Sequence, residues 1–391
     1  MNFSISSSNP RRFVIAVLVL LALLFALTLL ARQVLVATGD FLPEEEIVRI
    51  QQAAGKPCIF SEYGKQNEGF FKFQVYRTVK PDIAVLGSSR VLELTQRQFS
   101  RPFVNLGRMM TDIKRGESAV AELLAVHKPK FMLIGLDQYW FNPNWDEAGV
   151  DKVKLIRSDP NDPRAILRLM GIIWREGMWH EAWTALRNGP DCPLGVSAMR
   201  YHSGYAPDGY RYYGELLTAT KPAEDRHLRM TLGRIENGTR RFEKSATISQ
   251  SQFDYLMKMH RRLESEGVPH VFFFPHFAPT VTAAMEKDGG YGYIQELERA
   301  LAASGLPYVP TTDPLLQDCD FIDGFHMGDA ASIRQIKAVA EADPRVAPYL
   351  NMNEVNRLST PGALPVTYLT EDLGLPPRDY LDLGCTWAKT P

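Results

Sequence analysis

The sequence has no excess of charge of either sign. Its 391 residues include 44 Lys and Arg against 45 Asp and Glu, which gives a formal net charge of -1 at pH 7. A nucleic-acid-binding protein needs a basic field to collect phosphates, and this composition supplies none. We therefore expect no nucleic-acid partner. Repeats and low-complexity tracts are also absent, and the 45% hydrophobic and 23% charged residues are typical of a globular protein.

Cysteine is scarce. The four cysteines are Cys58, Cys192, Cys319 and Cys385. They form no Cys-x-x-Cys pair and lack a neighbouring histidine pattern, so we expect neither a metal site nor a bound cofactor. In an oxidising compartment they can form disulfides in any of three pairings, and free buried thiols are the alternative.

One long apolar run is present, at residues 13–31. It contains no charged residue, glycine or proline, and at about 1.5 Å per residue it is close to bilayer thickness. We therefore expect one transmembrane helix. Arg11 and Arg12 precede the run, whereas acidic residues at position 40 and at 44–46 follow it, so the positive-inside rule favours a cytoplasmic amino terminus.

A cleaved signal peptide is the alternative interpretation of this run, with Ala31 or Ala37 near the cleavage point. The run is longer than a usual signal core and no clear Ala-x-Ala follows it, which favours an uncleaved anchor. Either interpretation exports the protein. We expect a single-pass protein of the cell membrane whose main domain is periplasmic or extracellular.

Short apolar runs ending in Gly or a polar residue alternate with amphipathic segments. The expected strands are residues 83–87, 102–107, 131–137, 268–274 and 308–312, and the expected helices are residues 91–99, 116–127, 249–266, 293–303 and 330–340. Such alternation predicts an α/β fold with about five parallel strands and helices on both faces of the sheet.

The expected organisation follows from these elements. It comprises a cytoplasmic tip and membrane anchor (1–36), a lead-in (37–80), an α/β domain in two parts (81–141 and 245–345), a mainly helical insertion (142–244) and a tail (346–391). The insertion is rich in tyrosine, at positions 201, 205, 210, 212 and 213. These rings either pack inside the insertion, the more common role of aromatics, or stack on a sugar or acyl group.

Ser89 follows the first expected strand, in the segment Gly87-Ser88-Ser89. A hydroxyl at the carboxyl end of a central strand lies at the edge where open α/β folds place their chemistry. A helix over residues 91–99 would add backbone N–H groups and a positive dipole end beside it. Gly-Ser-Ser is also a common tripeptide, so a nucleophile needs a base and an orienting acid elsewhere in the chain.

Asp323 and His326 meet that need. Because they lie three residues apart in one turn, the carboxylate can accept from the Nδ1–H of the ring while Nε2 faces a hydroxyl. His276 follows the fourth expected strand and can line the same edge, although no acid lies near it in sequence. The other histidines we interpret as structural: His127, His180, His202, His227, His260 and His270.

Four segments together resemble the blocks of the SGNH (GDSL-type) hydrolase superfamily. They are Gly87-Ser88-Ser89, Asn105-Leu106-Gly107, Gly135-Leu136-Asp137 and Asp323-x-x-His326. The closest likeness is to its membrane-anchored branch, which includes the D-alanyl transfer protein of lipoteichoic acid biosynthesis and the alginate O-acetylation proteins. The resemblance covers residues 81–141 and 245–340 and implies a flavodoxin-like three-layer sandwich.

The resemblance also implies roles for individual residues. Ser89 would be the nucleophile, His326 the base and Asp323 its orienting acid, with an oxyanion hole made by the N–H groups of Ser89 and Gly107. An Asn is expected in the third block, but Asp137 stands there, and a carboxylate repels an oxyanion.

Three interpretations of this departure are open. Gln138 turns in as the donor, or Asp137 has another role, or the hole has two donors. Weaker candidates for substrate contacts are Arg90, Arg108, Tyr139 and His276, of which Arg108 is equally well explained as a surface ion-pair residue.

These residues predict an acyl-group enzyme that acts on a cell-surface glycan or lipid-linked glycan through an acyl-Ser89 intermediate. Transfer to a sugar hydroxyl would make it a transferase, and transfer to water an esterase. By resemblance we expect a membrane-bound O-acyltransferase as partner, besides membrane lipid. The alternatives are a catalytically inactive scaffold or glycan-binding subunit, which Asp137 favours, and a plain lipase or thioesterase.

Overall fold

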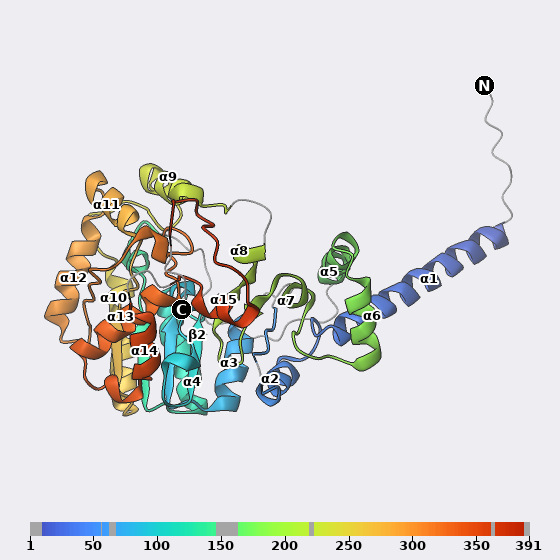
Figure 1. The fold of residues 1–391 in the computed structure, drawn as a ribbon, viewed down its shortest axis with the longest axis horizontal. Helices are drawn as coiled ribbons and strands as arrows, with labels where there is room; N and C mark the ends of the chain where they lie inside the picture. The colour runs from blue at the N-terminus through green and yellow to red at the C-terminus, as the bar shows by residue number, and fades with distance from the viewer. Residues whose placement is uncertain are drawn as a thin grey trace, which may run out of the picture.

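A computed structural model describes residues 10–55, 57–61, 68–145, 163–218, 223–360 and 364–386 of the protein. They form an α/β domain and one long apolar helix, α1 (Pro10–Ala37), which extends away from the domain (Figure 1). Helices α2 (Glu44–Ala53) and α3 (Glu68–Val79) lead from α1 to the sheet. The predicted α/β class and the predicted apolar amino-terminal helix are confirmed.

Four parallel strands form the central sheet. In the order in which they lie side by side they are β2 (Phe103–Gly107), β1 (Ile83–Gly87), β3 (Phe131–Gly135) and β6 (His270–Phe273). Gly87 lies opposite Gly107, so β1 and β2 end at the same level. Every residue of these strands is buried, as expected for a parallel sheet covered on both faces.

The predicted fifth strand at residues 308–312 is wrong, because this segment makes one parallel bridge, between Tyr308 and Phe272. The side-chain amide of Gln335 donates to the carbonyl of Phe274 over 2.7 Å. A continued parallel ladder would offer that carbonyl to the backbone of the neighbouring segment. The side chain of Gln335 thus ends the pairing.

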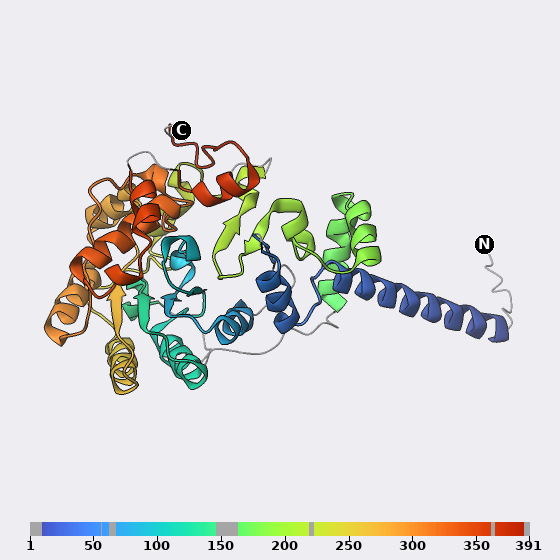
Figure 2. The ribbon, with the colours of Figure 1, turned by 60° about the horizontal axis from the view of Figure 1, so that its bottom comes forward.

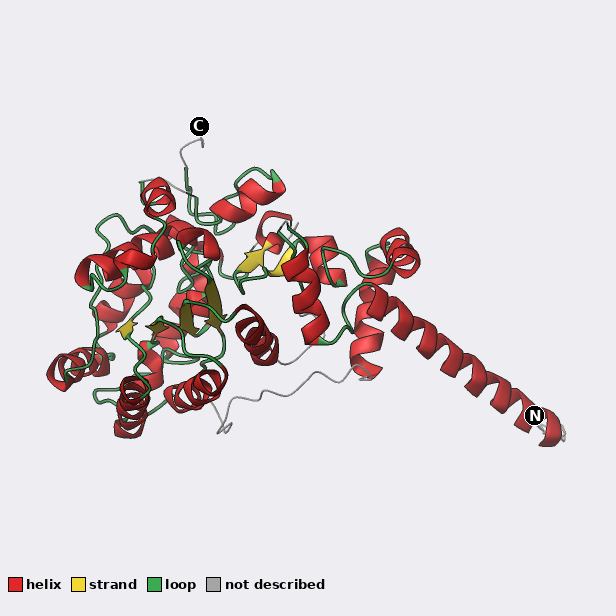
Figure 3. Cartoon of the chain, turned by 90° about the horizontal axis from the view of Figure 1, so that it is seen from below, coloured by secondary structure: helices red, strands yellow, loops and turns green. Residues whose placement is uncertain are grey.

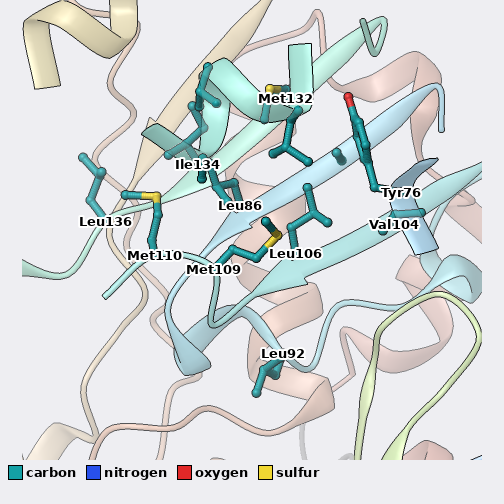
Figure 4. Packing of buried hydrophobic residues seen from close by; sticks show 14 of the residues in the cluster. Tyr76, Leu86, Leu92, Val104, Leu106, Met109, Met110, Met132, Ile134 and Leu136 are labelled. Carbon is teal, nitrogen blue, oxygen red and sulfur yellow. The ribbon is translucent and has the colours of Figure 1, made fainter. Parts of the chain in front are cut away.

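Helices cover both faces of the sheet, as predicted (Figure 2). Leu86, Leu106 and Ile134 point into one core, seen from close by in Figure 4, while Ile83 and Val85 point into the other. The helices on the first face are α3, α4 (Ile113–Val126), α10 (Gln250–Ser265) and α12 (Gly292–Ser304). Those on the second face are α13 (Asp329–Ala342), α14 (Met352–Leu358) and α15 (Thr367–Leu373).

The predicted helix over residues 91–99 is also wrong. In its place are two 3-10 turns, η1 (Ser89–Val91) and η2 (Gln96–Gln98). The amide of Asn105 on β2 donates to the carbonyls of Val91 and Leu94 over 2.7 and 2.8 Å, and these carbonyls would otherwise accept bonds within a helix. The segment that follows Ser89 therefore supplies no α-helix dipole.

The insertion consists, in its described residues, of short helices and an antiparallel hairpin that lies apart from the central sheet (Figure 3). Its elements are α5 (Pro163–Arg175), α6 (Trp179–Asn188), α7 (Val196–Tyr201), β4 (Ser203–Tyr205), β5 (Arg211–Tyr213), α8 (Gly214–Thr218) and α9 (Arg229–Asn237). Tyr205, Tyr210 and Tyr212 are at most 4% exposed, so these three rings pack inside the protein.

Two disulfides connect segments far apart in the chain. Cys58 in the lead-in bonds to Cys192 in the insertion, and Cys319 bonds to Cys385 in the tail. Cys319 lies in a 3-10 turn, η5 (Asp318–Asp320). Between β6 and this turn the chain forms helix α11 (Pro279–Asp288) and then α12. The disulfides and the apolar helix α1 indicate a secreted or extracytoplasmic domain.

Candidate active site

Ser89, His326 and Asp323 meet at the carboxyl edge of the sheet. The Ser89 hydroxyl lies 2.7 Å from Nε2 of His326, and Nδ1 of the same ring lies 2.7 Å from Oδ2 of Asp323. With the proton on Nδ1, that nitrogen donates to the carboxylate and Nε2 accepts from the hydroxyl. The three side chains therefore form one hydrogen-bonded series, as their spacing predicted.

Asp323 is held as an acceptor from several directions. Its second oxygen, Oδ1, accepts the backbone N–H groups of Phe325 and His326 over 2.9 and 2.8 Å. Burial by itself raises the pKa of Asp323, but the adjacent His326 ring and these hydrogen bonds outweigh burial and keep the pKa below its ordinary value. The carboxylate is therefore ionised at neutral pH.

Distant segments fix the loop that carries His326. Asp225 of the insertion accepts the N–H of Gly324 over 2.9 Å, and the Tyr380 hydroxyl of the tail donates to the carbonyl of Phe321 over 2.8 Å. The disulfide of Cys319 ties the start of the same loop to the tail. The sequence contains no local signal for these contacts, because each partner lies more than 50 residues away.

Ser88 supports the turn beside Ser89. Its hydroxyl accepts the N–H of Arg90 over 3.0 Å, which is the capping role expected of a small polar residue there. Gly135, at the end of β3, allows Val91 to pack under the turn, since a Cβ on this glycine would lie 2.4 Å from a methyl group of Val91. The backbone at Ser89 is thus fixed by neighbours on both sides.

Arg90 is buried beneath the site, with 1% of its surface exposed. All five of its N–H donors are engaged. They reach the carbonyls of Phe325 (3.0 Å), Pro275 (2.5 Å) and His276 (2.8 Å), and the side chains of Asp137 (3.0 Å) and Gln138 (3.1 Å). The prediction of a substrate contact is therefore wrong for Arg90. Its side chain connects the turn that carries Ser89 to the ends of β3 and β6 and to Phe325, the residue before His326.

Asp137 does not fit an oxyanion hole. Its carboxylate is buried, with one oxygen accepting from Arg90 and the other from the Tyr139 hydroxyl over 2.5 Å. An oxyanion needs donors, and this carboxylate is an acceptor already paired with a cation. The interpretation that Asp137 has another role is correct. Tyr139 is 5% exposed with its hydroxyl engaged, which contradicts a substrate contact through that group.

The remaining oxyanion candidates differ from one another. The Gly107 N–H donates to Oδ1 of Asn105 over 2.8 Å, so this expected donor is already engaged. The Ser89 N–H has no acceptor within the described residues. Gln138 turns its Oε1 toward Arg90, which leaves its amide nitrogen as a donor without an acceptor in the described part of the chain.

Arg108 and His276 lie at the edges of this region. Arg108 forms an ion pair with Glu68 at 2.6 Å, which confirms the surface ion-pair interpretation. The backbone carbonyl of His276 accepts a hydrogen bond from Arg90. Burial lowers the pKa of the His276 ring to about 4 and keeps this ring neutral. A substrate contact by His276 stays a prediction.

Arg241 is a cation near His326 that the sequence analysis did not single out. Its guanidinium carbon lies 5.5 Å from the ring centre of Phe325 and 5.6 Å from that of Tyr139, and the Phe325 ring lies 4.3 Å from the His326 ring. Arg240 and Arg241 both have positive φ, 52° and 84°, which is strained for residues other than glycine. The half-buried guanidinium forms no hydrogen bond within the described chain.

Comparison of the chain with models of known protein families, with curated proteins and with solved structures finds no match. The chemistry of the site is therefore argued from its own contacts. Among the described residues, no group of three or more His, Cys, Asp or Glu side chains is arranged to hold a metal ion.

Proposed function

We propose that this protein is a membrane-anchored, extracytoplasmic serine acyltransferase or esterase of the SGNH type, which O-acylates, in the simplest case O-acetylates, a cell-surface polysaccharide or glycolipid. The observation that carries the proposal is the hydrogen-bonded series from Asp323 through His326 to Ser89, with both side-chain distances at 2.7 Å. A weak nucleophile, a base and an orienting acid in this order are what serine acyl transfer requires.

The sheet topology supports the SGNH-type assignment. The order β2-β1-β3-β6 is that of a flavodoxin-like doubly wound sheet, in which β1 and β3 flank the point where the strand order reverses. Ser89 follows β1 and Gln138 follows β3, so both lie at that point. Active sites of open α/β folds occur there.

The proposed reaction has two steps. The Ser89 hydroxyl attacks the acyl carbonyl while its proton passes to Nε2 of His326, and the tetrahedral oxyanion meets the N–H of Ser89 and the amide of Gln138. The proton then moves from His326 to the leaving alcohol as the ester bond breaks, which yields an acyl-Ser89 ester. A sugar hydroxyl or water, deprotonated by His326, attacks that ester and regenerates Ser89.

Contacts at the end of α1 support an uncleaved anchor. Val34 and Leu35 are buried against the insertion, and the carbonyl of Thr38 accepts the N–H of Gly195 over 2.6 Å. Cleavage near Ala37 would place a charged amino terminus at Thr38, a residue only 1% exposed. An anchored enzyme can receive acyl groups from an integral membrane protein, so a membrane-bound O-acyltransferase is the proposed partner.

A second candidate function is a membrane-tethered scaffold or glycan-binding subunit without chemistry. The observation that favours it is the oxyanion side of the site, where the Gly107 N–H is engaged and Asp137 replaces a donor.

A serine-directed fluorophosphonate probe separates the two candidates on the full-length protein. The enzyme proposal expects labelling that disappears in Ser89→Ala and in His326→Ala and persists in two matched controls, Ser100→Ala and His180→Ala. Absence of labelling in the wild-type protein would reject the enzyme proposal in favour of the scaffold.

A further inference from the structure

Exposed apolar side chains gather on one hairpin of the insertion. Outside α1, four of the seven exposed large apolar residues of the described chain belong to α5 and α6: Leu167 (75% exposed), Trp174 (73%), Trp179 (47%) and Trp183 (60%). Single exposed leucines are ordinary in soluble proteins, but three exposed tryptophans on 26 consecutive residues, 163–188, are not.

The same hairpin packs against the end of α1. Val34 and Leu35 of α1 form a buried cluster with Ile166, Leu169 and Ile173 of α5, and Ala182 of α6 belongs to it as well. Figures 1 and 2 show α5 and α6 beside the end of α1 that joins the domain. Each helix of the hairpin therefore has an inner face covered by α1 and an outer face that carries the tryptophans.

The exposure of α1 locates the bilayer relative to the hairpin. Residues 11–30 of α1 are exposed and, apart from the two arginines at their start and Thr28, apolar, whereas burial against the domain begins at residues 31–35. Twenty helical residues span about 30 Å, the thickness of the hydrocarbon core. The helix thus leaves the hydrocarbon at the level where α5 and α6 pack on it.

The composition of the hairpin suits that level. Tryptophan concentrates at the boundary between hydrocarbon and headgroups, because its ring is apolar while its N–H needs a polar partner. The charged residues of 163–188 are four arginines and two glutamates, all six exposed: Arg164, Arg168, Arg175, Arg187, Glu176 and Glu181. Exposed arginines next to an apolar face extend toward lipid phosphates.

We infer that the α5–α6 hairpin is seated in the membrane interface around α1, with Leu167 and the three tryptophans among the phospholipid headgroups and upper acyl chains. The hairpin then acts as a second attachment beside the single span and fixes the orientation of the α/β domain over the bilayer. This inference requires that α1 be retained as an anchor, and it is independent of any chemistry at Ser89.

Depth-dependent fluorescence quenching of the full-length protein in lipid nanodiscs tests this inference. The discs contain phosphatidylcholine and phosphatidylglycerol, brominated either near the headgroup or near the bilayer centre. We expect blue-shifted tryptophan emission that shallow bromines quench more strongly than deep ones. The variant W174F/W179F/W183F keeps an apolar hairpin but should lose most of the quenchable emission.

Two results would overturn the inference. Emission that neither set of bromines quenches would place the hairpin outside the lipid. Aqueous quenchers then separate two cases: the tryptophans lie in water if these quenchers reach them in native membranes, and against a membrane-protein partner if they do not. Stronger quenching by deep bromines would place it in the hydrocarbon. Because fluorophosphonate labelling of Ser89 is measured separately, failure of the proposed enzyme activity leaves this result unaffected.

Discussion

On one side of Ser89 the hydroxyl meets His326 and Asp323 in an unbroken series of hydrogen bonds, whereas on the other side two of the four groups expected to stabilise an oxyanion, the Gly107 N–H and Asp137, are engaged elsewhere. The base side is fixed by the insertion, the tail and a disulfide. The oxyanion side retains the Ser89 N–H and the amide of Gln138. If the protein is the proposed enzyme, the difference means that the fold holds the groups for proton transfer firmly, while charge stabilisation depends on few groups.

The largest effect should follow from Asp323→Asn, which removes the carboxylate that accepts the hydrogen bond from His326. An amide cannot hold the His326 tautomer that accepts the serine proton, so we expect kcat to fall about 10⁴-fold, with folding preserved. Hydrolysis of a chromogenic acetyl ester by the full-length protein measures this loss. Asp318→Asn, at the start of the same loop, is the matched control, and an equal loss in both variants would contradict the role of Asp323.

Arg90→Gln should destabilise the protein by about 3–5 kcal/mol, because it leaves Asp137 as an unpaired buried charge. The double variant R90Q/D137N should recover part of this stability, since it removes the unpaired charge as well. Chemical unfolding of the detergent-solubilised protein measures both changes. A double variant no more stable than R90Q would show that the pair is not the source of the loss.

Asp329, at the start of α13, should make the stability of the folded protein depend on pH. Burial raises its pKa from 3.8 to about 7, although the Tyr210 hydroxyl and the Tyr368 N–H both donate to the carboxylate. The folded state then binds the proton more tightly than the unfolded state, so its contribution to stability is complete below about pH 4 and is lost as pH rises through about 7.

We expect this loss to approach 4 kcal/mol as an upper limit, since one pKa unit corresponds to about 1.4 kcal/mol. Asp329→Asn should flatten the decline in melting temperature between about pH 4 and 7. Thermal unfolding at several pH values, with Asp343→Asn as the control carboxylate, measures the slope. A variant with the wild-type slope would exclude Asp329 as its source.

Gln138→Ala tests whether the oxyanion side of the site uses the Gln138 amide. If the amide is a donor to the oxyanion, kcat should fall about 10²- to 10³-fold with little change in KM. Gln138→Glu should cost as much, because it replaces the donor by an acceptor of the same shape. Ester hydrolysis at saturating substrate measures both, and near-normal kcat in either variant would leave the Ser89 N–H as the remaining candidate.

The smallest effect belongs to Arg241, whose guanidinium lies beside the Phe325 ring near the base. If it meets a negatively charged group of the glycan, Arg241→Gln should raise KM for an acidic glycan about tenfold, as expected for one charge-assisted hydrogen bond. Arg241→Lys should lose less, and a neutral ester should be unaffected. An equal rise in KM for the neutral ester would contradict this role.

Local patterns were sufficient to predict most of the sheet and the base side. The strands expected at residues 83–87, 102–107 and 131–137 are confirmed as β1, β2 and β3, the last ending two residues early, and the Asp323 to His326 spacing places the two side chains in contact. Each of these features depends on residues close together in the chain. Periodicity likewise predicted α4, α10, α12 and α13.

Features set by distant contacts could not be predicted in this way. The helix expected after Ser89 is replaced by turns because the side chain of Asn105 donates to two of the carbonyls that the helix would use. The expected fifth strand ends where the side chain of Gln335 donates to the carbonyl of Phe274. Arg90 was expected to contact substrate, yet its five partners come from three segments of the chain, at residues 137–138, 275–276 and 325. Helices α14 and α15 are too short for their periodicity to be recognised.

The most direct test is to locate the acyl group itself. The full-length protein is incubated with an activated acetyl ester, quenched in acid and mapped by peptide mass spectrometry. We expect one acetyl group on Ser89 in the wild-type protein and none in His326→Ala, because the serine needs its base. Acetylation of another residue, or no adduct while the ester is still hydrolysed, would contradict Ser89 as the nucleophile.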